Sequence, residues 1–171
     1  MEVMALKLRS IHILAGVLLF VISPAAQADV AWDTGNTKHT NLSVFAAMDT
    51  KSDESGYGAA LSIYDRGLTD LSYVDLGDFR VAQFAKLSPK QIGMYSAYFG
   101  FALAHADPKV EGLDAPDGML SGLSLIMAET DLAFGLSVEL RATSLSKDFD
   151  PIAWFTDPDV LWLGAGVSYT F

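Results

Sequence analysis

The chain has 171 residues, no cysteine, and 21 acidic against 11 basic side chains. This length allows one domain, and the lack of cysteine excludes disulfides and thiolate metal sites. The acidic balance argues against nucleic acid as a partner, because phosphate contacts need a basic face.

Residues 1–28 have the pattern of a secretory signal peptide. Two basic residues precede an apolar run over 11–22, and residues 26–28 read Ala-Gln-Ala, a small-x-small cleavage site. An uncleaved anchor is the alternative, but the run is shorter than the roughly 20 residues that a spanning helix needs. Cleavage after Ala28 leaves 29–171 with 9 basic and 20 acidic residues. We therefore expect an exported domain over 29–171.

Beyond residue 40, apolar and polar residues alternate with a period of two, in segments bounded by Gly, Pro, Asp and Ser. The pattern predicts eight strands, at about 41–49, 57–65, 71–77, 79–87, 92–105, 118–129, 132–144 and 160–171. The third and fourth are the least regular, because Asp75, Arg80 and Gln83 leave their register open. If these two were one longer strand with a bulge, the total would be odd.

The connections between these strands alternate in length. The short ones lie at 66–70, 88–91 and 130–131. The long ones lie at 50–56, 106–117 and 145–159. Outer-membrane barrels combine short periplasmic turns with longer extracellular loops in this way. The connection at 77–78 is the exception, because it is short on the side where long loops are expected. An even number of strands would place both termini in the periplasm.

The last predicted strand shows the clearest alternation. Its apolar face holds Leu161, Leu163, Ala165, Val167, Tyr169 and Phe171, and its other face is mostly small or polar. The aromatic last residue and the alternate apolar residues before it resemble the C-terminal strand of bacterial outer-membrane β-barrels. In that family this strand is the recognition signal for the barrel-assembly machinery. The residues that match it are Leu163, Ala165, Val167, Tyr169 and Phe171.

By size, residues 29–171 are similar to the eight-stranded class of the OmpA transmembrane domain and OmpX. The resemblance implies an all-β fold, a closed antiparallel transmembrane β-barrel of about eight strands in a Gram-negative outer membrane. The implied partners are outer-membrane lipid, lipopolysaccharide and the barrel-assembly machinery, with no nucleic acid and no cofactor. No subfamily motif is matched, so no subfamily activity follows, and the oligomeric state stays open.

A soluble exported barrel of lipocalin type is the rival structure, since it also shows period-two strands. Such a barrel would gather the leucines inside and place Glu139 and Arg141 in water. The Gly- and Ser-rich second face of the last strand fits a narrow barrel interior better. We therefore predict that the apolar side chains face lipid.

Glu139 and Arg141 lie two residues apart on the inward face of the seventh predicted strand. They are predicted to form an ion pair in the lumen. The alternative is a polar path for small solutes, but an eight-stranded barrel is just wide enough for side chains to fill it.

His105 is the histidine that falls within a predicted strand, at the end expected to face outside the cell. As the general base of a lipid-modifying barrel it would need a nearby hydroxyl, and Ser121 or Ser124 on the next strand are the candidates. The His-x-Ser spacing of lipid A deacylases is absent. We expect an interfacial histidine and no catalysis, with the lipid-modifying enzyme as the alternative.

Two long connections are acidic. The carboxylates are Asp107, Glu111, Asp114 and Asp117 in one and Asp148, Asp150, Asp157 and Asp159 in the other. Such oxygens can hold Ca²⁺ or Mg²⁺, but no EF-hand-type spacing is present and charge runs are usually solvated. No specific metal site is predicted. Trp154 and Phe155 are expected to anchor their loop at the membrane interface, or to serve a receptor or adhesion surface.

Overall fold

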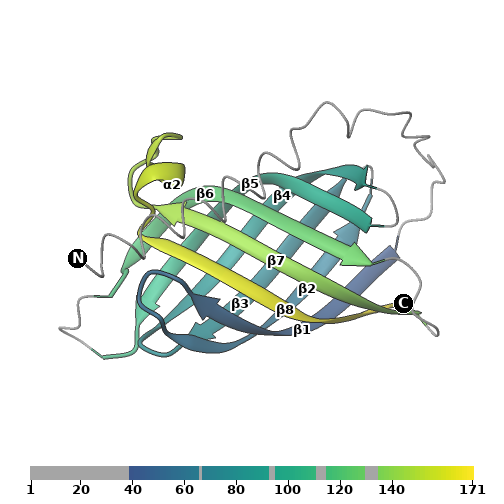
Figure 1. Ribbon diagram of the computed structural model, residues 1–171, viewed down its shortest axis with the longest axis horizontal. Helices are drawn as coiled ribbons and strands as arrows, with labels where there is room; N and C mark the ends of the chain where they lie inside the picture. The colour runs from purple at the N-terminus through teal and green to yellow at the C-terminus, as the bar shows by residue number, and fades with distance from the viewer. Residues whose placement is uncertain (1–38, 66, 93–94, 111–114, 130–134) are drawn as a thin grey trace. The chain divides into compact units, whose positions relative to one another are not determined.

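The structure is a computed structural model that describes residues 39–65, 67–92, 95–110, 115–129 and 135–171. Within these ranges, eight antiparallel strands form one closed barrel, in which each strand pairs with its sequence neighbours and β8 pairs with β1 (Figure 1). The strands are β1 (His39–Asp49), β2 (Ser55–Tyr64), β3 (Leu68–Leu76), β4 (Phe79–Ile92), β5 (Tyr95–Pro108), β6 (Gly118–Glu129), β7 (Leu136–Ser146) and β8 (Val160–Thr170). The predicted fold class and strand number are confirmed.

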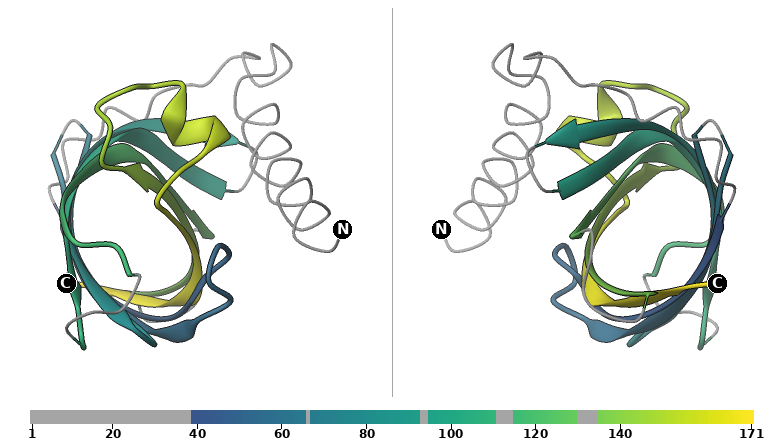
Figure 2. Two further views of the ribbon diagram at one scale, coloured as in Figure 1. Left: turned by 90° about the vertical axis from the view of Figure 1, so that its left-hand side faces the viewer. Right: turned by 90° about the vertical axis from the view of Figure 1, so that its right-hand side faces the viewer.

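A short helix, α2 (Ala153–Thr156), lies between β7 and β8. Seen along the barrel, the strands form a closed ring, and α2 lies beside the wall at one end (Figure 2). In the part of the chain that the structure describes, no helix is long and apolar enough to cross a membrane. The expected signal peptide, residues 1–28, lies outside the described residues.

The two least regular predicted strands are separate strands. β3 and β4 pair antiparallel across a tight turn at Gly77 and Asp78, with Leu76 opposite Phe79. The prediction was wrong in placing Asp70 in the preceding connection. Asp70 lies within β3, which begins at Leu68, and its side chain is buried.

The expected short turn at 88–91 is also wrong, because β4 continues through these residues to Ile92. Pro89 is tolerated there for a structural reason. The pairing of β4 with β3 ends at Leu87, opposite Leu68, so beyond it β4 pairs only with β5. A proline, which has no N–H to donate, fits such a one-sided stretch of strand. The expected start of the seventh strand, 132–134, lies outside the described residues.

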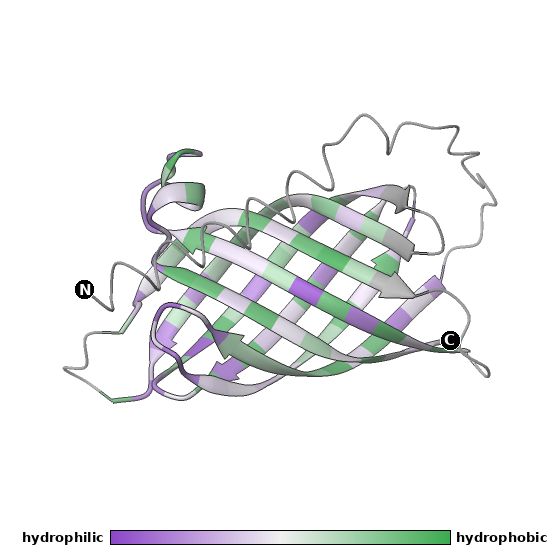
Figure 3. Cartoon of the chain, viewed as in Figure 1, coloured by the Kyte–Doolittle hydropathy of each residue, from purple (hydrophilic) through white to green (hydrophobic). Residues whose placement is uncertain are grey.

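Alternate residues face opposite sides of the wall, and the hydropathy changes along each strand accordingly (Figure 3). In β1 the buried and exposed positions alternate strictly from Asn41 to Asp49. The exposed positions include Leu42, Val44 and Met48. The outer wall is therefore largely apolar.

The interior has two kinds of surroundings. Buried polar side chains include Asn41, Ser43, Ser62, Asp70, Ser72, Gln83, Ser124, Glu139, Arg141, Thr143 and Ser168. Large apolar side chains are also buried, among them Phe45, Leu68, Leu76, Phe79, Val81, Leu120, Leu145 and Trp162. The expectation that only polar and small residues line the interior is therefore too simple, because an eight-stranded barrel must fill its own core.

Candidate functional site

The interior is organised around Arg141, which β7 directs into the barrel. Its Nη1 atom donates to both carboxylate oxygens of Asp70, at 3.1 and 3.0 Å. Its Nε atom donates to Glu139 Oε1 at 3.2 Å. The structure thus brings the predicted pair Glu139 and Arg141 together and adds Asp70, which the sequence did not indicate. All three side chains are buried.

The contact between Arg141 and Asp70 crosses the barrel. Arg141 belongs to β7 and Asp70 to β3, and these strands are four apart in either direction around the closed sheet. One guanidinium nitrogen, Nη1, is shared between the two carboxylate oxygens here, and hydrogen bonds between two ionised groups are stronger than those between neutral ones. The ion pair therefore links opposite walls of the barrel across the lumen.

Serine hydroxyls complete this network. Ser62 Oγ donates to Asp70 Oδ1 at 2.6 Å, and Arg141 Nη2 lies 3.4 Å from the hydroxyls of both Ser43 and Ser62. These residues come from β1, β2, β3 and β7. Buried charges are tolerated when their remaining donors and acceptors are satisfied in this way.

Aromatic rings cover one side of the Arg141 guanidinium. Its Cζ atom lies 4.9 Å from the centroid of the Phe45 ring, which stacks in turn on Trp162 with centroids 5.6 Å apart. Glycines make room for the Phe45 ring: a Cβ atom at Gly58 would lie 2.4 Å from it, and one at Gly164 would lie 3.0 Å from it. The Gly-rich inner face that the sequence showed thus has a specific packing role.

A second group of polar contacts adds β4 and β6 and meets β7 again. Ser124 and Thr143 hydroxyls lie 3.0 Å apart, and Gln83 Nε2 donates to Ser124 at 3.4 Å. Together with the Arg141 network, these contacts connect side chains of β1, β2, β3, β4, β6 and β7 inside the barrel. Side chains that cross and fill the lumen fit a closed interior better than an open path.

The outer wall is the second feature of functional interest. Val44 is 57% exposed and Leu140 is 54% exposed, although both lie in the middle of strands. The other outward apolar side chains with large exposure include Leu42, Ile63, Leu71, Tyr73, Phe84, Phe101, Val138 and Val167. A soluble barrel of lipocalin type is expected to place mostly polar side chains at these positions.

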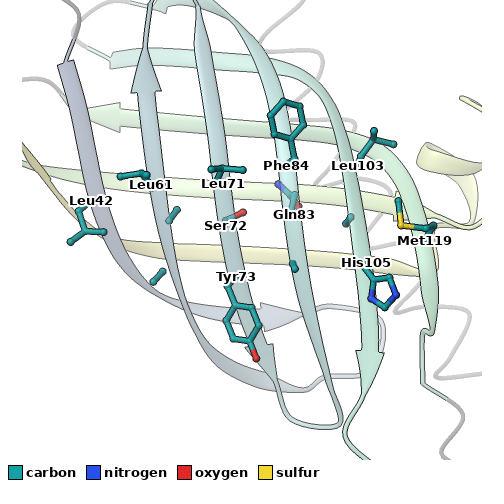
Figure 4. A pocket seen from close by; sticks show the side chains of 14 residues that line it. Leu42, Leu61, Leu71, Ser72, Tyr73, Gln83, Phe84, Leu103, His105 and Met119 are labelled. Atoms are coloured by element: carbon teal, nitrogen blue, oxygen red, sulfur yellow. The ribbon is translucent and has the colours of Figure 1, made fainter.

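An open and mostly apolar pocket is lined by residues of β1 to β6 (Figure 4). Its lining includes the small residues Ala59 and Ala82 beside Tyr73 and His105. These four residues follow one another along a single row of paired positions, from Ala59 on β2 to His105 on β5. His105 is exposed within this row.

Within the described ranges, neither candidate serine is hydrogen-bonded to His105, because the Ser121 hydroxyl has no hydrogen-bond partner and the Ser124 hydroxyl contacts Gln83 and Thr143. His105 pairs with Met119, whereas Ser121 pairs with Leu103, one position further along the same face. Ser124 lies on the inner face, where it contacts Gln83 and Thr143. A base and a nucleophile on opposite faces of one sheet cannot share a substrate, which excludes Ser124 as the partner of His105 but not Ser121.

The residues matched to the assembly signal alternate as the sequence indicated. Ala165, Val167, Tyr169 and Phe171 are exposed on the outer side of β8, and Leu163 is half-buried. Tyr169 and Phe171 stack, with ring centroids 6.4 Å apart. This places an apolar and aromatic row along the strand that closes the barrel against β1.

At the end of the barrel opposite Phe171, Asp49 connects the β1–β2 connection to the start of β8. One oxygen of its buried carboxylate accepts from the Leu161 N–H at 3.1 Å, and the other accepts from the N–H and hydroxyl of Ser52. Lys51 donates to the Pro158 carbonyl at 2.8 Å, so the two neighbouring connections are joined. Among the described residues, no group of three or more His, Cys, Asp or Glu side chains is placed to hold a metal ion. Glu111 and Asp114 lie outside those residues.

The geometry defines a class of protein, the closed eight-stranded antiparallel β-barrels with an ion-paired interior and an apolar outer wall. No protein-family model matches the chain, and no curated protein matches it.

Proposed function

We propose that this chain is an integral β-barrel of a Gram-negative outer membrane, exported through a cleaved signal peptide. It contributes to envelope structure or to surface interactions through its acidic loops, and it carries out no catalysis. Its partners are outer-membrane lipid and lipopolysaccharide, and the barrel-assembly machinery during biogenesis, which reads the row from Leu163 to Phe171.

The observation that carries this proposal is the exposed apolar wall. Contiguous exposed apolar surface of this extent is unusual on a soluble monomer and marks contact with a membrane or a partner. On the outer face of β8, Ala165, Val167 and Tyr169 are exposed, Leu163 before them is half-buried, and Phe171 follows the strand. At about 3.3 Å per residue, the span from Leu163 to Phe171 is roughly 26 Å of strand, and a tilt of about 40° gives a height of roughly 20 Å. This height approaches the apolar band of outer-membrane barrels, which is about 25 Å tall.

The ion-paired interior supports the same proposal. A transmembrane barrel can keep polar side chains inside because its outer face, not its core, supplies the apolar surface. Arg141 binds Asp70 and Glu139 inside the barrel and so links the opposite strands β7 and β3. This arrangement favours a structural barrel over a conducting one.

Cell fractionation combined with a heat-modifiability gel tests the proposal. We expect the processed protein in the outer-membrane fraction, with different migration before and after boiling, because a closed barrel resists detergent unfolding until it is heated. Recovery of the processed chain as a freely soluble periplasmic protein would refute the proposal. Flotation of the purified, refolded protein with phosphatidylcholine vesicles supplies a measurement that does not depend on expression level.

A further inference from the structure

The connection between β7 and β8 folds against the outside of the wall (Figures 1 and 2). Ser144 donates its hydroxyl to the Trp154 carbonyl, and the Trp154 ring lies 5.7 Å from the Phe101 ring, centroid to centroid. Phe101, Leu123 and Ser144 follow one another along one row of paired positions on β5, β6 and β7. Trp154 therefore spans this row from one end to the other.

Local hydrogen bonds hold the connection in this position. Asp150 Oδ1 accepts from the Ile152 N–H at 2.9 Å, and Thr156 Oγ1 donates to the Ile152 carbonyl at 2.9 Å. Asp159 Oδ2 accepts from the Lys147 N–H at 2.7 Å, which ties the two ends of the connection together. The segment is thus a defined turn whose side chains have fixed directions.

This turn exposes large apolar side chains. Phe149 is 67% exposed and Ile152 is 68% exposed, and α2 contains no buried residue. The neighbouring β1–β2 connection differs, because Lys51, Ser52 and Asp53 are its exposed residues. In the β5–β6 connection at the same end of the barrel, Val110 is also exposed, at 59%. The β7–β8 turn differs in carrying two such side chains within four residues, beside a helix that has no buried residue.

We propose that residues 149–155 lie in the interfacial zone of the lipid layer around the barrel, with Phe149 and Ile152 in contact with lipid. This inference rests on the proposed function and deepens it. The turn is continuous with the apolar wall through Trp154 and Phe101, so the medium that surrounds the wall also meets the turn. Outer-membrane barrels carry girdles of aromatic side chains at this boundary, and Phe149 and Phe155 supply such rings in the turn.

The charges around the turn set its depth. Asp148, Asp150 and Asp157 are exposed beside the apolar side chains. Ionised carboxylates are excluded from hydrocarbon but are accommodated at headgroup level, where short apolar side chains reach inward. The turn therefore lies at the headgroup boundary and fixes the height of this side of the barrel in the membrane.

Tryptophan quenching by brominated phosphatidylcholine tests this placement. The background is the full chain with Trp32→Phe and Trp154→Phe, which keeps Trp162 because that residue is buried in the interior. Three variants are compared after refolding into vesicles: Ile152→Trp in the turn, Leu140→Trp in the middle of the wall, and Asp78→Trp in the exposed β3–β4 turn. Bromine is placed either near the headgroup or near the end of the acyl chain.

We expect Ile152→Trp to lose more emission with bromine near the headgroup, and Leu140→Trp to lose more with bromine at the chain end. Asp78→Trp should lose little with either lipid. If Leu140→Trp is quenched but Ile152→Trp behaves like Asp78→Trp, this inference is wrong and the proposed function stands. If Leu140→Trp is itself unquenched, the proposed function fails. Shielding of Ile152→Trp that appears only at high protein concentration would point to a second copy and overturn the lipid contact.

Discussion

The Arg141 guanidinium lies over the Phe45 ring, with its Cζ atom 4.9 Å from the ring centroid. The same guanidinium binds Asp70 on the opposite wall, so one side chain joins the aromatic stack to the ion pair. A cation that is desolvated on an aromatic face gains more from that contact than an exposed one does. Arg141 is therefore the residue on which the order of the lumen depends most.

Replacement of Arg141 by methionine should destabilise the barrel strongly. It leaves the buried carboxylates of Asp70 and Glu139 without their cation, and breaking a buried pair from one side costs about 3–5 kcal/mol. The measurement is the free energy of unfolding in urea, with the protein refolded in lipid vesicles. Arg80→Met is the matched control, since Arg80 pairs with Asp75 at 3.5 Å at a partly exposed position. That change should cost less than about 1 kcal/mol. Equal losses in both variants would contradict a special stabilising role for the ion pair between Arg141 and Asp70.

The barrel should require glycine at position 58, because the Phe45 ring packs against that position. A Cβ atom there would lie 2.4 Å from the Cε2 and Cζ atoms of Phe45, so Gly58→Ala should cost about 1–3 kcal/mol through overpacking. Phe45→Leu removes these two atoms, and in that background Gly58→Ala should cost less, with the remaining cost coming from the Tyr73 carbonyl oxygen 2.9 Å from the added Cβ atom. Gly166→Ala is the control that Phe45→Leu should not rescue, because its Cβ atom would lie 2.1 Å from the Val44 carbonyl oxygen. A double-mutant cycle of unfolding free energies gives the comparison.

The sequence was sufficient for the strands whose alternation is regular. β8 shows the predicted division between an apolar outer row and a small or polar inner one, and β6 (Gly118–Glu129) has the predicted bounds. These features depend only on local patterning and turn residues, which a period-two pattern records directly. The expected position of Glu139 beside Arg141 followed from the same local rule.

Long-range contacts could not be predicted from this pattern. Asp70 and Arg141 form a hydrogen bond although 71 residues separate them in the sequence. Whether the two side chains come into contact depends on how the strands are staggered around the closed sheet. The alternation pattern assigns Asp70 to the connection at 66–70, because Gly, Pro, Asp and Ser residues bound the predicted strands. The continuation of β4 through Pro89 was missed for a similar reason, since only the pairing register shows that β3 has already ended there.

Replacement of His105 by alanine should leave lipid A chemistry unchanged. His105 is exposed on the outer face, and Ser124 is on the inner face, so the two cannot form a base and nucleophile pair. Mass spectrometry of lipid A from cells that express wild type, His105→Ala or Ser121→Ala makes the comparison. A modification that is present with wild type and lost in both variants would instead establish a lipid-modifying enzyme.

The purified protein should show no discrete conductance steps in planar bilayers. Arg141 and Asp70 bridge opposite strands across the lumen, and Phe45 and Trp162 stack beside them. An eight-stranded barrel leaves room for little more than such side chains. Insertion should be verified by heat modifiability of the same sample, and regular single-channel steps from an inserted protein would support the narrow-pore alternative.

The substitution Leu140→Arg should show whether the outer face of the barrel is surrounded by lipid or by water. Leu140 is on the outer face of β7, four residues from Leu136 at one end of the strand and six from Ser146 at the other. An arginine facing lipid at mid-depth costs about 2–4 kcal/mol, whereas the same residue on a water-exposed strand would be nearly neutral. Unfolding free energies in vesicles should therefore fall for Leu140→Arg and change little for Asp148→Arg, which is exposed in the β7–β8 connection. Leu140→Ala separates the cost of the charge from the loss of the leucine. A Leu140→Arg barrel as stable as the Leu140→Ala barrel would mean that water, not hydrocarbon, surrounds β7.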